Sequence, residues 1–287
     1  MKIKKYLKIG KPSIKGSILV LIGIFNSRNG IGIEIFTNNL IYGPLGFLFL
    51  ALSGIMIIKL LQILNNPSYK GKISKKGISM IIGTLYIIGF ILIIANIAEN
   101  MIIYYFNIPL ILFTVFIGIF WILLGFFGFK KTKVIIYINI LIVTLSFSIG
   151  LIYGVILNKF IIPVYIYSFF FSISFLQMSR ELIKRFNNKE RIEEYMLFPN
   201  TVNDRKILKA SLIFQFSALI FLVLPIFMKV IISYLILFLM ILGLITISLA
   251  SFLTLASLLE KEIYKKISLI LKIGILLELI TLLVLGI

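Results

Sequence analysis

The 287-residue chain contains no cysteine and no histidine, and Asp204 is its only aspartate. Without cysteine there are no disulfides and no thiolate chemistry. Without histidine there are no His-dependent catalytic triads, no haem ligation by histidine and none of the usual zinc sites. With a single aspartate, the chain cannot hold a metal between a pair of aspartate ligands. The remaining candidates for chemistry are therefore cations, glutamates and neutral polar groups.

Negative charge is also scarce, with 10 acidic residues against 29 Lys and Arg and a formal net charge of +19. Hydrophobic residues make up 61% of the chain, and the mean hydropathy is +1.14. This composition is typical of a protein that crosses a membrane several times. The basic residues lie in short loops between apolar runs, as membrane topology requires, so nucleic acid is not predicted as a partner.

Crossing the hydrocarbon core takes about 20 apolar residues, and nine segments meet this requirement. The predicted fold is therefore all-α, with nine transmembrane helices in a single domain over residues 1–287. The predicted spans are residues 14–36, 40–64, 78–98, 109–129, 134–157, 161–182, 207–228, 230–258 and 267–287.

With these spans, 24 basic residues fall on the side of the N-terminus and two, Lys159 and Lys229, on the other. The side richer in Lys and Arg is normally cytoplasmic. We therefore predict an integral protein of the cell membrane with its N-terminus in the cytoplasm and its C-terminus outside.

The longest polar interruption covers residues 175–210 and precedes the seventh predicted span. It holds half of the acidic residues and eight of the basic ones: Arg180, Lys184, Arg185, Lys189, Arg191, Arg205, Lys206 and Lys209. A second polar loop separates the second and third spans. Any charged chemistry of the protein is predicted to involve residues 175–210.

At both loops the chain resembles the UbiA superfamily of intramembrane prenyltransferases. In the sixth-to-seventh loop, the residues that match the family pattern are Arg180, Glu181, Ile183, Lys184, Leu197, Pro199, Lys206 and Ala210. In the second-to-third loop they are Pro67, Gly71, Ile73 and Ser74. Two further sequence patterns also resemble the family: Lys11-Pro12, and the basic run Lys130–Lys133 followed by Asn139. The resemblance covers nearly the whole chain and implies nine helices around a central cavity.

The resemblance also implies magnesium held by two aspartate clusters, and here the chain departs from the family. The aspartate positions correspond to Leu52, Ile55 and Lys59 in the first cluster and to Arg185, Asn188 and Ile192 in the second. Magnesium needs hard oxygen ligands in near-octahedral geometry, which these residues do not supply. We therefore predict neither a metal site nor another cofactor.

Cations stand where the family has metal-binding anions, and this suggests a metal-free site for a phosphate. The candidates for binding it are Lys59, Lys70, Lys72, Lys130, Lys184 and Arg185. The alternative is that these six side chains reach lipid headgroups at the cytoplasmic interface, as Lys and Arg commonly do.

Other polar residues have two interpretations each. Arg180 and Glu181 either orient the loop over the cavity or form a local ion pair. Arg28 and Glu278 are predicted inside the first and ninth spans, where ionisable residues are functional candidates. The alternative is a buried structural network or, for Glu278, a protonated carboxyl group. Four phenylalanines either line an isoprenoid cavity or pack helices and face lipid: Phe169, Phe170, Phe171 and Phe175.

Three functional hypotheses follow. The first is a UbiA-type homologue that binds an isoprenoid or anionic membrane lipid without magnesium-dependent catalysis. The second is an active prenyltransferase that uses Lys and Arg in place of the metal. The third is a transporter, although the chain shows only modest Gly and Pro interruption of its helices.

Overall fold

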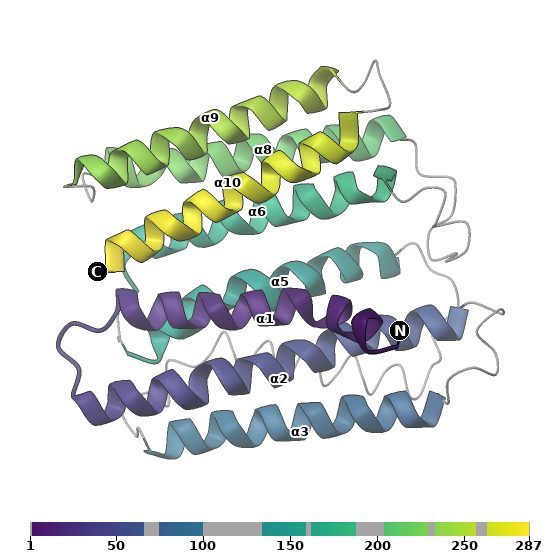
Figure 1. Cartoon of the computed structure of the whole chain (residues 1–287), viewed down its shortest axis with the longest axis vertical. Helices are drawn as coiled ribbons and strands as arrows, with labels where there is room; N and C mark the ends of the chain where they lie inside the picture. The colour runs from purple at the N-terminus through teal and green to yellow at the C-terminus, as the bar shows by residue number, and fades with distance from the viewer. Residues whose placement is uncertain are drawn as a thin grey trace. The chain divides into compact units, whose positions relative to one another are not determined.

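The computed structural model describes residues 2–65, 75–99, 134–158, 162–187, 204–228, 233–256 and 263–286. Within these ranges the chain folds into eight helices, with no strand among them (Figure 1). The helices are α1 (Lys2–Asn26), α2 (Ile33–Asn65), α3 (Lys75–Glu99), α5 (Val134–Ile156), α6 (Val164–Asn187), α8 (Asp204–Phe227), α9 (Tyr234–Ala256) and α10 (Tyr264–Gly286).

Eight of the predicted spans correspond to these helices in the same order. The fourth, residues 109–129, lies outside the described part of the chain, so the count of nine stays a prediction. Five described segments are long and apolar enough to cross a membrane: Ile33–Ile57, Lys76–Asn96, Arg205–Phe227, Tyr234–Ala256 and Tyr264–Gly286. The prediction of an all-α membrane protein is confirmed.

The prediction that Arg28 lies inside a membrane span is wrong. Helix α1 ends at Asn26 and α2 begins at Ile33, so the predicted span 14–36 runs across a turn. Arg28 lies in this turn and is exposed. Gly30 has a φ of 87°, a backbone conformation that glycine adopts without strain. The prediction joined the end of α1 and the start of α2 into one span because apolar residues lie on both sides of the turn.

The helices cluster into two compact units, and the first contains α1, α2, α3 and α5. Within it, α1 packs against α2 and α5, and α2 packs against α3. Helices α1 and α5 approach so closely at Gly150 and Gly154 that neither position has room for a side chain. A Cβ at Gly150 would meet the backbone of Gly16, and one at Gly154 would meet the backbone of Val20. Small residues allow such approach between membrane helices.

A polar joint ties three helix ends of this unit together. Asn39 of α2 donates hydrogen bonds to the carbonyl oxygen of Leu157 and to Oδ1 of Asn158, both at 2.8 Å. Asn158 in turn donates to the carbonyl oxygen of Ile24, also at 2.8 Å. The carbonyl groups of Ile24 and Leu157 lie at the C-terminal ends of α1 and α5, where a helix no longer supplies its regular hydrogen-bond donors.

The second unit contains α6, α8, α9 and α10. Helix α6 packs against α8 and α10, and α9 packs against the same two helices. Its core includes the fully buried side chains of Ile173, Leu176, Leu222, Ile247 and Leu271. This unit holds most of the described polar residues that are candidates for function. The prediction of a single domain stays a prediction.

Candidate functional site

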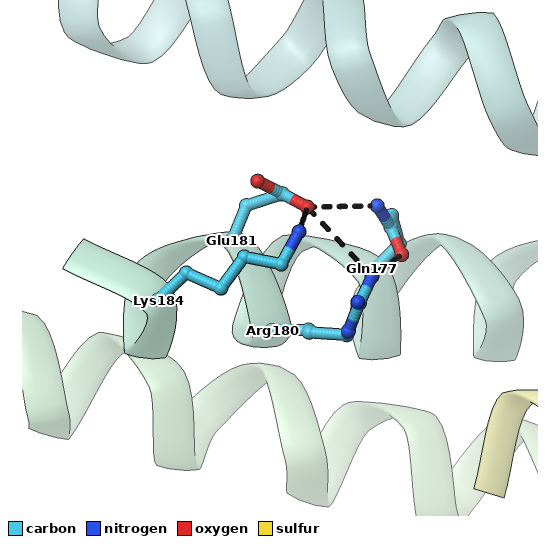
Figure 2. A network of polar contacts seen from close by, with 4 residues as sticks. All are labelled: Gln177, Arg180, Glu181 and Lys184. Carbon is cyan, nitrogen blue, oxygen red and sulfur yellow. Dashed lines mark hydrogen bonds and ion pairs between the residues drawn. The ribbon is translucent and has the colours of Figure 1, made fainter. Parts of the chain in front are cut away.

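The last turns of α6 carry a compact group of charged and polar side chains, Gln177, Arg180, Glu181 and Lys184 (Figure 2). Residues three and four apart on a helix are neighbours on its surface, so this spacing brings all four side chains together. We call this group the α6 cation cluster.

Glu181 is the common partner within the cluster. Its Oε1 accepts hydrogen bonds from Nε2 of Gln177 at 3.0 Å and from Nζ of Lys184, and it lies 3.9 Å from Nη1 of Arg180. Arg180 also donates from Nη1 to Oε1 of Gln177 at 3.5 Å. The ion pair between Arg180 and Glu181 that the sequence suggested is therefore present. Its role in orienting a loop stays a prediction.

The cluster carries one carboxylate for two cations, so it has a net positive charge. Exposed fractions of the side chains are 15% for Arg180, 21% for Glu181 and 33% for Lys184. Nε of Arg180 is buried and has no hydrogen-bond partner among the described residues. Partial burial strengthens electrostatic attraction, because water screens the charges less. Such a cluster is suited to holding an anion.

A buried polar network lies beside the cluster and connects three helices. Ser179 of α6 and Ser211 of α8 share a hydrogen bond of 2.7 Å between their hydroxyls. Nε2 of Gln215 on α8 lies 2.9 Å from Oγ of Ser179 and 3.1 Å from Oγ1 of Thr254 on α9. All four side chains are fully buried. The network fixes the register of α6 next to Arg180, and so it positions the cations.

Glu278 is buried within the second unit and is 1% exposed. Its Oε1 lies 2.7 Å from the hydroxyl of Ser172 on α6. The same hydroxyl donates to the carbonyl oxygen of Ala218 on α8 at 3.0 Å. Glu278 therefore belongs to a buried network, one of the two interpretations that the sequence allowed.

Only part of the predicted phosphate site falls within the described side chains. Lys184 lies in the α6 cation cluster. Lys59 lies on α2 and Arg185 on α6, but their side chains are outside the described part. Lys70, Lys72 and Lys130 also lie outside the described residues, as do Asn188 and Ile192.

Ile55 stands at a position where the resemblance implies a metal-binding aspartate. Its side chain is 5% exposed and belongs to the apolar core of the first unit. Leu52, at the neighbouring aspartate position, is half-buried. Within the described ranges, no group of three or more His, Cys, Asp or Glu side chains lies close enough to hold a metal ion. The described residues at these positions do not fit the magnesium site of the family.

Aromatic side chains form a stack between α6 and α8. Phe171 and Phe175 of α6 pack against Phe221 of α8, with ring centroids 5.0 and 5.7 Å apart, and Phe175 stacks on Phe214 at 5.9 Å. Phe169 is fully buried. The ring of Phe170 lies 5.1 Å from that of Phe171. These contacts favour a packing role for the four phenylalanines.

Several polar residues of the site were missed at the sequence level, namely Gln177, Ser172, Ser179, Ser211, Gln215 and Thr254. The signal that could have found them is their spacing. Ser172 and Ser179 are seven residues apart, and Ser211 and Gln215 four apart, which places each pair on one face of a helix. Polar residues on a common face of an apolar helix indicate a buried network.

No protein-family model matches the chain. No curated protein matches it either. Among solved structures, the chain is similar to a digeranylgeranylglyceryl phosphate synthase described in membranes, with a TM-score of 0.69 and 21% identity. The likeness covers 99% of this chain and 98% of that one. At this identity the likeness shows that the chain shares the fold of that synthase, in agreement with the predicted all-helical membrane fold.

Proposed function

We propose that this chain is a divergent UbiA-type homologue that binds the phosphate of an isoprenoid or anionic lipid without magnesium-dependent catalysis. Buried Ile55 carries the proposal, because it occupies a position where the family would need a carboxylate for its metal. The full-length likeness to a synthase whose name includes a lipid phosphate supports the lipid class of the ligand.

The α6 cation cluster supplies the groups for binding a phosphate. Arg180 and Lys184 already meet at a single carboxylate oxygen, so their charged nitrogen atoms converge on one point. A phosphate oxygen next to this point would receive charge-assisted hydrogen bonds from both cations. Glu181 holds them in place and lowers the net charge to a value that partial burial tolerates.

Purified protein in detergent, titrated with geranylgeranyl phosphate, tests the proposal. We expect the Kd to be the same within about threefold with magnesium or with a chelator. Replacing both cations, Arg180→Gln with Lys184→Gln, should weaken binding by about tenfold or more, equivalent to at least about 1.4 kcal/mol. Lys272→Gln, which changes an exposed lysine of α10, is the matched control and should bind like the wild type.

Two results would overturn the proposal. The first is that the protein binds no geranylgeranyl phosphate, with magnesium or with the chelator. The second is that binding requires magnesium. Glu181→Gln provides a further check, because it removes the carboxylate that competes with the phosphate for the two cations. This variant should bind several-fold more tightly at low ionic strength, and the gain should shrink as salt is added.

The second candidate is an active prenyltransferase, and the likeness to a synthase favours it. The enzyme would transfer a prenyl group from a prenyl diphosphate to a lipid or aromatic acceptor, with Lys and Arg stabilising the diphosphate as it leaves. Radiolabelled geranylgeranyl diphosphate should then give a labelled lipid product, and Arg185→Ala should abolish turnover. Binding without any product would leave the first candidate. The transporter hypothesis gains no support from the contacts of the described residues.

A further inference from the structure

The hydroxyl of Ser172 lies between two acceptors. Oε1 of Glu278 is 2.7 Å from its Oγ, and the carbonyl oxygen of Ala218 is 3.0 Å from it. Ser172 is fully buried, and Glu278 is 1% exposed. A hydroxyl carries one hydrogen, so it can donate to only one of these two oxygen atoms.

If Glu278 were ionised, one of the two short contacts would lack a hydrogen. The carboxylate would also be a buried charge, and its Oε2 has no hydrogen-bond partner among the described residues. Burying a charge without a partner is strongly unfavourable. If Glu278 carries a proton on Oε1, it donates to Ser172 and Ser172 donates to Ala218. Both contacts then hold a hydrogen, and Oε2 is left as a neutral carbonyl oxygen.

No described charge lies opposite the carboxyl group to stabilise its ionised form. On α6, the charged residues Arg180, Glu181 and Lys184 begin eight residues after Ser172, about 12 Å along the helix. On α8, the nearest cation is Lys209, nine residues before Ala218, or about 13 Å. Helix α9 has no charged residue.

The remaining ionisable groups are also remote. On α10 itself, Lys272 is exposed and lies six residues before Glu278, about 9 Å along the helix. Lys265 and Lys266 lie further away and are exposed. Tyr165 and Tyr167 of α6 lie at least five residues before Ser172, and Tyr234 at the start of α9 is exposed. Tyr264 stands at the start of α10, fourteen residues before Glu278.

We propose that Glu278 is a proton-binding site within the second unit, a neutral carboxylic acid that donates to Ser172 and thereby joins α10, α6 and α8. The proposal is independent of lipid binding. Because α6 also carries the cation cluster, loss of this proton loosens the helix that positions Arg180 and Lys184. The joint is complete when the proton is bound, and it weakens as the pH rises and the proton leaves.

Infrared spectroscopy of the purified protein at pH 7 tests the proposal. The exposed carboxyl groups are ionised at this pH, so a carboxylic acid C=O band requires a buried acid. We expect this band in the wild type, its shift in D2O, and its loss in Glu278→Gln. Glu34→Gln, which changes an exposed glutamate of α2, should keep it. Absence of the band in the wild type, or its persistence in Glu278→Gln, would overturn the proposal.

Two further measurements cover the case in which Glu278→Gln fails to fold. Ser172→Ala removes the hydrogen-bond acceptor of the acid, so the C=O band should move, and an unmoved band would contradict the proposed bond. In the wild type, the band should fade as the pH is raised, together with a fall in Tm. A folded Glu278→Gln variant should lack the part of this fall that comes from the proton, because its amide keeps its hydrogens at every pH.

Discussion

Gln215 illustrates how a single residue stabilises the second unit. Its amide nitrogen lies within hydrogen-bond distance of Ser179, Ser211 and Thr254, on three helices counting its own. Removing it leaves three buried hydroxyls with fewer partners, and buried polar groups without partners are costly. Inside membrane proteins such hydrogen bonds are individually modest, because the unfolded chain also finds partners within the membrane.

We therefore expect Gln215→Leu to lower the free energy of unfolding by about 1–2 kcal/mol. Unfolding of the purified protein by SDS, followed by circular dichroism, would measure the change. Thr84→Val is the control, because Thr84 is exposed on α3 and its one hydrogen bond within the described residues goes to a carbonyl of its own helix. It should change stability by less than about 0.5 kcal/mol. Equal effects of the two substitutions would show that the network contributes nothing.

At the scale of helices, the contact between α1 and α5 depends on glycine. A Cβ at Gly154 would overlap backbone atoms of Val20, which cannot move aside without shifting a whole helix. By contrast, a Cβ at Gly243 of α9 would meet only the end of the Leu222 side chain, at 3.3 Å. The two glycines share a helical backbone and differ in what surrounds them.

Gly154→Ala should destabilise the protein by roughly 1–3 kcal/mol, because overpacking forces the helices apart. Gly243→Ala should be close to neutral, since the gain in helix propensity of up to about 1 kcal/mol offsets the small shift of Leu222. The Tm values of both variants would distinguish them. If Gly154→Ala were as stable as Gly243→Ala, the close approach of α1 and α5 would be refuted.

The turn between α1 and α2 shows where hydropathy misleads at this scale. The segment Asn26–Gly30 contains the turn residues Asn, Ser and Gly, including an Asn-Gly pair. These residues favour a turn, because Gly adopts a positive φ without strain. Averaged hydropathy hid this signal, since long apolar runs lie on both sides. With Arg28 in this turn, the predicted outer side of the membrane carries three basic residues, and the predicted cytoplasmic side carries 24.

For the whole molecule, the arrangement in the membrane is the first matter to test. The excess of basic residues predicts that the start of α9 lies outside the cell and the start of α10 inside. Because the chain has no cysteine, single cysteines can be introduced without a background. Tyr234 is 91% exposed at the start of α9, and Lys265 is exposed at the start of α10.

In intact cells, a membrane-impermeant maleimide should label Tyr234→Cys and leave Lys265→Cys unlabelled. Permeabilised cells should label both, which controls for access to each position. The reverse pattern in intact cells would place the N-terminus outside and refute the predicted orientation.

Hydropathy and charge alone were sufficient to establish a helical membrane protein, because the bilayer imposes a span length and a bias in Lys and Arg on any chain that crosses it. The same reasoning located the polar end of α6, and the spacing of Arg180, Glu181 and Lys184 already implied that they meet, since neighbours on one helix are set by its pitch. The absence of metal-binding aspartates is likewise evident from composition.

Contacts between helices required the folded structure, because residues far apart in sequence come together only through packing. Glu278 and Ser172 are separated by 106 positions, and Gln215 and Thr254 by 39. No local pattern pairs these residues, since several rotations of each helix about its axis would bury a similar apolar surface. The packing of α6 against α8 and α10 selects one rotation, and this choice brings the buried carboxyl group of Glu278 within hydrogen-bond distance of the hydroxyl of Ser172.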